Sequence, residues 1–314
     1  MFIEKSDLRP FLEKLSKSME VYIPSGPRFE RLSKGVDMNL SRKTFFSAKK
    51  LFFPQREVLF EFDAKGKTIK EGIKAPGIVL FGARPCDLNA VKYMDMVFRD
   101  DPYYIKRREN TVLIGLQCGK PKLFENCYCH YTGTFFADNY DILLIESDSG
   151  FAAKPGSEKG IGLLESRFFS EKGKNPDSLL EELKKEYVAL TGGKMKSMED
   201  IRDSEVKKLA KDCFSCTACT TVCPTCHSFV IEDELNTDLK SGRRVRLWDS
   251  CQLQRYTRVA GNNVFRPSRL QRVRQRINCK FRYSLEQQNM MSCTGCGRCI
   301  DVCNKEIDIF KVFG

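Results

Sequence analysis

Hydrophobic residues in the first half of the chain follow the spacings of alternating strands and helices. Residues 6–18 predict an amphipathic helix, whose apolar face carries Leu8, Phe11, Leu12 and Leu15. Apolar runs at residues 77–82, 111–116 and 141–146 have the length and composition of strands that are buried on both faces. A helical pattern over residues 87–98 separates the first two runs. Strand, helix and strand at this spacing predict an α/β fold with a parallel-type sheet.

Shorter patterns surround these runs. Residues 21–23, 51–53 and 58–62 resemble strands and are separated by turns that contain Pro and Gly. Residues 147–174 are polar and rich in Gly, Lys and Ser, which predicts an excursion over the surface.

Helical patterns dominate the second half. They cover residues 176–190, with Pro176 suited to a first helical position, and residues 198–211, which lead directly into a group of cysteines. We place a domain boundary near residue 195, with an α/β domain over 1–195 and a second domain over 196–314. A long Arg-rich insert between the cysteine motifs is expected to be helical. The second domain is therefore predicted to be a largely helical, ferredoxin-like dicluster domain.

Length and composition limit the class of protein. A chain of 314 residues is long enough for two domains with separate cores. The 15 cysteines come with no recognisable signal peptide and with no apolar run near the roughly 18 residues that a membrane helix needs. These features predict a cytoplasmic protein without membrane insertion, in a reducing and oxygen-poor cell whose thiols stay free to bind metal.

Eight cysteines form two motifs with ferredoxin spacing. They are C-x2-C-x2-C-x3-C-P from Cys213 to Pro224, and C-x2-C-x2-C-x3-C from Cys293 to Cys303. Three thiolates at this spacing bind three corners of an iron–sulfur cube, and the fourth cysteine serves the neighbouring cube. We assign one [4Fe–4S] cluster to Cys213, Cys216, Cys219 and Cys303, and another to Cys293, Cys296, Cys299 and Cys223. Zinc is the simpler alternative, but its sites use paired C-x2-C hooks.

The formal charge of +12 invites comparison with nucleic-acid binders. Four thiolates on an oxidised cube sum to about −2, so three such clusters would leave the folded protein near +6. Nucleic-acid binding is disfavoured because no recognition helix or aromatic-interleaved basic motif is present. The basic residues could instead form a solvated helix face, tune a cluster or dock a negatively charged partner. Their densest run is Arg266, Arg269, Arg272, Arg274, Arg276 and Arg282.

Four further cysteines follow the predicted strands. Cys86 and Cys118 come just after the strands at 77–82 and 111–116, at the sheet edge where parallel folds bind ligands. Cys127 and Cys129 are spaced so that their side chains point the same way on an extended chain. These four residues could hold a third [4Fe–4S] cluster or a zinc ion, or could be buried structural thiols.

The chain resembles a family of iron–sulfur subunits found in archaeal sulfhydrogenases, as the beta subunit, and in anaerobic sulfite reductase. The likeness runs from about residue 20 to 303 and is weakest over 147–200. Its motifs are FGARPCDLNA at 81–90, GLQC at 115–118, ENCYC at 125–129, CFSCTACTTVCPTC at 213–226, WDSC at 248–251, the 261–266 region and CTGCGRC at 293–299. In this family the cysteines of the first half resemble ligands of a further cluster, which favours that interpretation of Cys86, Cys118, Cys127 and Cys129.

The resemblance implies an electron-relay component of a soluble multisubunit oxidoreductase. Such a protein passes electrons between a flavin subunit that takes them from NAD(P)H and a catalytic subunit of the sulfite-reductase type. The alternative is the equivalent component of a nickel–iron (sulf)hydrogenase or a heterodisulfide-reductase-type complex. A radical or hydratase-type enzyme would need an iron without a cysteine ligand, whereas both ferredoxin sets are complete. The chain shows no nucleotide-binding Gly motif or other substrate site of its own.

A few residues remain outside these assignments. Cys226, Cys251 and Cys279 belong to none of the three sets, and Cys226 is expected to be a buried neighbour of a cluster. His130 and His227 each follow a cysteine and could tune a cluster through a hydrogen bond, or be packed or surface side chains.

Overall fold

The computed structural model describes residues 1–192 and 198–313. A seven-stranded mixed sheet organises the first half of the chain, in the order β1-β9-β8-β7-β6-β2-β3. Four central strands are parallel neighbours, β2 (Glu20–Ser25), β6 (Ile78–Ala83), β7 (Thr111–Leu116) and β8 (Ile142–Ser147). Antiparallel strands complete the edges, β1 (Phe2–Glu4), β3 (Arg28–Arg31) and β9 (Gly150–Pro155). The predicted buried runs are therefore the centre of the sheet.

Helices cover both faces of this sheet. One face packs against α1 (Lys5–Leu15) and α6 (Glu158–Leu164), with Leu8, Phe11 and Leu164 in the shared core. The other face packs against residues of α2 (Lys49–Phe52), α3 (Pro85–Val97), α4 (Pro102–Glu109) and α7 (Pro176–Thr191). The two cores arise because side chains alternate across each strand, so that Val79 and Phe81 face one core while Leu80 faces the other.

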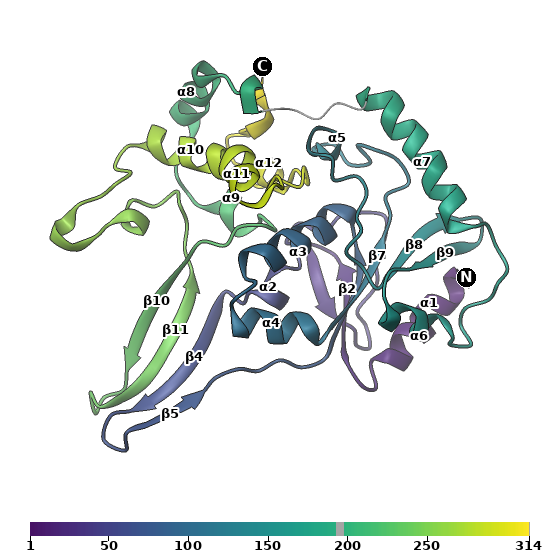
Figure 1. The fold of residues 1–314 in the computed structure, drawn as a ribbon, viewed down its shortest axis with the longest axis horizontal. Helices are drawn as coiled ribbons and strands as arrows, with labels where there is room; N and C mark the ends of the chain where they lie inside the picture. Colours follow the sequence, from purple (N-terminus) through teal and green to yellow (C-terminus); the bar gives the residue numbers. More distant parts are fainter. Residues whose placement is uncertain (193–197, 314) are drawn as a thin grey trace.

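A second, four-stranded antiparallel sheet joins distant parts of the chain, in the order β10-β11-β4-β5. It pairs β4 (Arg56–Asp63) and β5 (Thr68–Glu71) with β10 (Phe229–Leu235) and β11 (Ser241–Trp248), and forms the long ribbon that projects from the rest of the molecule in Figure 1. The prediction of a helical insert is therefore wrong for residues 229–248. Strand β11 is stabilised by pairing with β4, nearly 200 residues away, which local patterns do not reveal.

The cysteine motifs lie among short helices. These are α5 (Cys129–Thr132), α8 (Asp203–Asp212), α9 (Ala218–Thr221), α10 (Arg269–Asn278), α11 (Ser284–Gln288) and α12 (Arg298–Asp301). Single turns of other helix types accompany them, at Met198–Asp200, Gln254–Thr257, Ala260–Asn262, Cys279–Tyr283 and Ile309–Phe313. A third core, which includes Val206, Ile277, Phe281 and Phe310, packs these elements together.

Two other predictions differ from the structure. Residues 51–53, expected in a strand, overlap helix α2, and the polar stretch at 147–174 contains the buried strand β9 and helix α6. The predicted boundary near residue 195 lies outside the described residues and stays a prediction. Among the described helices, none is long and apolar enough to cross a membrane.

Arg246 joins the second sheet to the helical layer that covers the first. Its side chain is 3% exposed and lies on β11, where Nε donates to Glu57 at 3.0 Å and the guanidinium also pairs with Asp101. The same group lies over the rings of Phe53 and Phe98, at 5.0 and 5.6 Å. A buried charge with such partners is costly to remove, because Glu57 and Asp101 would both lose an ion pair and Glu57 would keep only Arg107.

We therefore expect Arg246→Ala to lower the free energy of unfolding by about 3–5 kcal/mol, since Glu57 would lose a buried partner. The matched control is Arg244→Ala on the same strand. Arg244 pairs with Asp233 at 2.8 Å, but both side chains are more than 40% exposed, so its loss should cost less than about 1 kcal/mol. Urea unfolding of both variants measures the difference, and equal losses would contradict this account.

Candidate metal centres

The two ferredoxin-type loops have the same backbone conformation. In the first loop, Ser215 and Thr217 have φ of 56° and 71°, and at the equivalent positions of the second loop Gly295 and Gly297 have φ of 59° and 73°. A one-turn helix follows each loop, α9 and α12 respectively. Left-handed backbone costs a non-glycine residue roughly 1–2 kcal/mol, so its repetition in the first loop indicates a functional constraint.

Both loops also direct backbone amides at their first cysteine. The Ser215 amide donates to Cys213 Sγ at 3.3 Å. Burial raises the pKa of Cys293 well above its usual value, and a hydrogen bond from the Gly295 backbone opposes that shift. Amide donors of this kind stabilise negative sulfur. The repeated loop is therefore a cradle for thiolate ligands.

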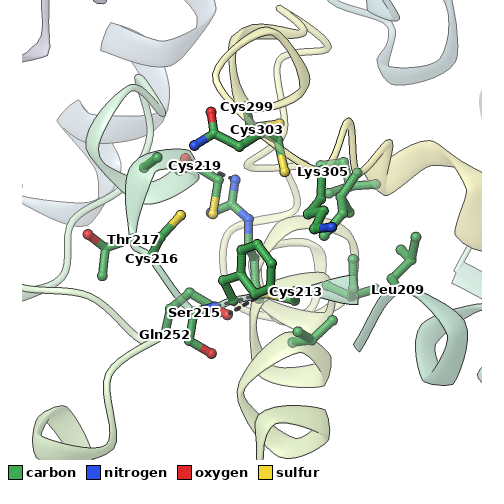
Figure 2. Close-up of a pocket in the computed structure, with 18 residues that line it drawn as sticks. Leu209, Cys213, Ser215, Cys216, Thr217, Cys219, Gln252, Cys299, Cys303 and Lys305 are labelled. Carbon is green, nitrogen blue, oxygen red and sulfur yellow. Dashed lines mark hydrogen bonds between the residues drawn. The ribbon is translucent and has the colours of Figure 1, made fainter. Parts of the chain in front are cut away.

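One cavity gathers the first predicted ligand set. It is lined by Cys213, Cys216, Cys219 and Cys303. Figure 2 shows the sulfur atoms of Cys216, Cys219 and Cys303 around this space. Apolar side chains of α8 and α10, Leu209, Val273 and Ile277, form part of the wall. At the mouth Phe214 is exposed, with the Lys305 ammonium 5.0 Å from its ring centroid. This set is therefore close to the surface.

A second, smaller cavity gathers the other set, Cys223, Cys293, Cys296 and Cys299. Cys299 lines both cavities, and so does Arg276 of α10. The fourth cysteine of each motif lines the cavity of the other motif, which is the crossed arrangement expected from ferredoxin spacing. The two ligand sets are direct neighbours.

Cys219, Cys293 and Cys299 would stay protonated without a metal. Burial raises the pKa of Cys219 to about 12 and that of Cys299 to about 11, although Arg276 opposes the shift in both. Cys223 differs, because Lys280 and Arg276 outweigh the effect of burial and lower its pKa to about 6. Iron would supply the positive charge that displaces the remaining protons. The donor set, all thiol and partly pre-ionised, fits an iron–sulfur cube.

The four cysteines of the first half lie at the carboxyl edge of the large sheet. Cys86 is in the first turn of α3, after β6, and Cys118 follows β7, while Cys127 and Cys129 precede and begin α5. Burial raises the pKa of Cys118 to about 12, with further contributions from Cys127 and Cys129, so these three thiols lie within electrostatic range. Burial also raises the pKa of Cys86, and Cys118 and Cys296 of the second ferredoxin-type loop raise it further, so both lie within electrostatic range of Cys86. The structure thus brings this set together beside the second ferredoxin-type set.

Direct contacts join these two cysteine regions. The Tyr128 amide donates to the Gly295 carbonyl at 2.7 Å, and Thr134 Oγ1 donates to the Thr294 carbonyl at 2.8 Å. A methyl group on Gly297 would lie 1.8 Å from the Asn126 carbonyl oxygen, so only glycine permits this approach. The segment that carries Cys127 and Cys129 is therefore packed onto the second ferredoxin-type loop.

An ion pair strengthens the same junction. Arg298, within the second loop, is fully buried and pairs with Asp87 at 2.9 Å, next to Cys86. Arg298 Nε also donates to the Thr44 carbonyl at 2.8 Å. Lys43 Nζ donates to the Cys296 carbonyl at 2.6 Å and pairs with Asp301 at 2.9 Å. Three segments of the first half, at Lys43–Thr44, Asp87 and Tyr128, thus hold the second loop.

The arginine run does not form one face. Arg272 and Arg276 of α10 are 8% and 6% exposed and lie inward, whereas Arg274 is 41% exposed and pairs with Asp203. Lys280 and Lys49 are also buried, which the sequence analysis did not predict. The signal for Lys280 is its spacing, since Arg272, Arg276 and Lys280 recur every four residues, each followed by an apolar residue.

The two histidines are neutral near pH 7. Burial lowers the pKa of His130 and of His227 to about 4. Within the described ranges, no group of three or more Cys, His, Asp or Glu side chains is arranged to hold a single metal ion.

Comparisons with known proteins agree with iron–sulfur binding by the second half of the chain. Residues 212–307 match the family described as "4Fe-4S dicluster domain". The chain is 33% identical over 325 residues to the Sulfhydrogenase 2 subunit beta of Pyrococcus furiosus, an alignment that covers 96% of this chain and 93% of that protein. No solved structure matches the chain. The chain therefore belongs to the family of 4Fe-4S dicluster iron–sulfur subunits that includes the sulfhydrogenase beta subunit.

Proposed function

We propose that this protein is the iron–sulfur electron-transfer subunit of a multisubunit oxidoreductase. The observation that carries the proposal is the pair of equivalent cysteine loops whose cavities adjoin at Cys299 and Arg276. Adjacent clusters that change oxidation state with little rearrangement are suited to the passage of single electrons. A substrate site is not needed for this role.

Three ligand sets follow from this proposal. Cys213, Cys216, Cys219 and Cys303 would hold one [4Fe–4S] cluster, and Cys293, Cys296, Cys299 and Cys223 a second. Cys86, Cys118, Cys127 and Cys129 would hold a third. When bound, each cluster accepts and returns one electron. The protein's own residues hold the ligands, exclude water and set the local charge.

The contacts favour one order along the relay. The first set adjoins the second through Cys299, and the second adjoins the third through Cys296 and the Tyr128–Gly295 hydrogen bond. The first set also has the most exposed surroundings, since Cys216 is exposed and Phe214 is 66% exposed. We infer that electrons pass between a partner at the first set and a partner near the third.

The partners are proposed as a flavin-containing NAD(P)H subunit and a catalytic redox subunit. The relative is named as the beta subunit of a sulfhydrogenase, which favours a hydrogenase-type catalytic partner. A sulfite-reductase-type partner is the second candidate, on the strength of the sequence motifs that the two kinds of iron–sulfur protein share.

Native purification tests the choice of partners. We expect the chain to copurify anaerobically with a flavoprotein and a nickel-containing subunit, and the complex to oxidise hydrogen with a nicotinamide or a dye as acceptor. Sirohaem and sulfite reduction in the same complex would instead establish the second candidate. A chain that purifies alone, with full iron and no partner, would contradict the relay proposal.

Iron analysis tests the third ligand set. Cys118→Ser should lower the iron content of the anaerobically purified chain by about four per molecule relative to the wild type, because one cube loses a ligand. Ser147→Ala, at the end of the neighbouring strand β8, is a control for a buried polar change away from the cysteines. Unchanged iron in Cys118→Ser, or zinc in place of iron, would remove the third cluster.

A redox titration tests the role of the buried cations. Arg276 donates to the Cys219 carbonyl at 3.1 Å and lines both cavities, so its charge should stabilise the reduced clusters. Arg276→Gln is expected to lower a cluster potential on the order of 60 mV, a tenfold change in a one-electron equilibrium. Arg269→Gln on the same helix removes an exposed charge and should leave the potential unchanged. Equal effects of the two substitutions would contradict the assignment.

A further inference from the structure

A buried lysine lies beside a polar cavity that the proposed electron relay does not use. Lys49 of α2 is 6% exposed, and its ammonium donates to the Cys226 carbonyl at 3.2 Å. The same ammonium lies 3.7 Å from the centroid of the Trp248 ring. Among the described residues, Lys49 forms no ion pair with a carboxylate. A carbonyl oxygen and a ring face offer only partial negative charge, so the buried ammonium lacks a full counter-charge.

The cavity beside Lys49 has room for a small ligand. Its volume is about 170 Å³. A cavity of roughly 10–15 Å³ already holds one water molecule, so a polyatomic ion fits here. Its wall is mainly polar, and besides Lys49 it includes Gln55, Thr221, Ser228 and Arg255. Amide, hydroxyl and guanidinium groups all donate hydrogen bonds. The cavity therefore offers a cation and several donors to a ligand.

One carboxylate, that of Asp249, also lines this cavity. Its side chain is 5% exposed, accepts the Ser250 amide at 2.7 Å and pairs with Arg255 at 3.6 Å. Arg255 thus compensates the charge of Asp249 within the wall. The charge that remains unbalanced at the cavity is that of Lys49.

A larger hollow adjoins this cavity. Its volume is about 540 Å³, and it shares three lining residues with the first, Gln55, Thr221 and Trp248. The charged residues of its wall are all basic, Arg28, Lys50 and Arg56. The two arginines pair with glutamates, whereas Lys50 is exposed and forms no ion pair among the described residues. Positive charge along this path would draw an anion toward Lys49.

We propose that the cavity at Lys49 binds one phosphate-type oxyanion. The anion supplies the missing counter-charge and accepts hydrogen bonds from the ammonium, which has three N–H groups and uses one on Cys226. Thr221 and Gln55, where the two hollows meet, offer donors to its other oxygens. Donors on several sides suit an ion with three or four oxygens better than a carboxylate with two. This binding site is distinct from the cysteine sets and does not depend on the relay proposal.

Two sources could supply such a group. One is free phosphate, and the other is a nucleotide whose phosphate enters the cavity. In the second case the base would occupy the larger hollow, whose wall also includes the rings of Phe46 and Trp248. Inorganic phosphate and AMP are therefore the two probes.

Isothermal titration calorimetry of the full, anaerobically purified chain with its clusters tests the site. In a chloride buffer without phosphate or sulfate, the wild type should bind one phosphate per chain in a saturable manner. Lys49→Met should weaken this binding by about tenfold or more, because a charge-assisted hydrogen bond is lost. Lys50→Met is the matched control, since Lys50 is exposed and lies outside the inner cavity, and it should change the affinity by less than about threefold.

Thr221→Asp is a second test that leaves the buried lysine in place. Thr221 is exposed and lines both hollows, so the fold should tolerate a carboxylate there, while an anion would be repelled. Phosphate binding should be lost, with the iron content unchanged from the wild type. Tighter binding of AMP than of phosphate would identify a nucleotide as the ligand, and equal or weaker binding would identify free phosphate.

Three results would overturn the site. The first is no saturable binding of phosphate or AMP by the wild type below about 10 mM, in which case Lys49 serves only to balance the neighbouring cysteines. The second is binding that survives Thr221→Asp, and the third is an equal loss in Lys49→Met and Lys50→Met. If Lys49→Met does not fold, the wild type and Thr221→Asp decide. Each result concerns anion binding and not iron, so none of them tests the relay proposal.

Discussion

Buried positive charge next to buried sulfur is the constraint on which this structure depends. Arg276 and Lys280 lie in the interior without an ion pair to any carboxylate among the described residues, and the groups that raise their pKa against the effect of burial are cysteines. Neither the cations nor the thiolates would be stable there alone, because each group would bear the cost of desolvation without compensation. Together they form a charge-balanced interior once iron is bound, which links folding of the second half to cluster assembly.

Buried charge also stabilises the junction between the two halves. Arg298 belongs to a cysteine loop, but its counter-ion is Asp87, which follows Cys86 on α3. One ion pair thus orients the second ferredoxin-type loop against the edge of the large sheet. The close approach at Gly297 and the ribbon formed by β4 and β11 join the halves at two further places. These contacts fix the cysteines of the first half relative to the second ferredoxin-type loop, so the separation of clusters held by the two regions would be constant.

The sequence predicts what depends on local pattern. The buried runs at β6, β7 and β8, the helix α3 and the crossed cysteine sets can be predicted from the sequence, because strand burial and ferredoxin spacing are properties of short segments. The hairpin of β10 and β11 could not be predicted in this way, because β4, its partner strand, is distant in the sequence and β10 is largely exposed. Burial of Lys49 could not be predicted, since lysine is usually a surface residue, and burial of Lys280 is signalled only by its four-residue spacing from Arg276.

Electron paramagnetic resonance of the fully reduced protein tests the central claim most directly. If neighbouring ligand sets hold iron–sulfur cubes in one rigid interior, the reduced chain must give a low-temperature spectrum broadened by magnetic interaction between adjacent clusters. A spectrum of isolated, non-interacting centres would contradict the arrangement. A silent spectrum from a chain that contains zinc would contradict the whole account.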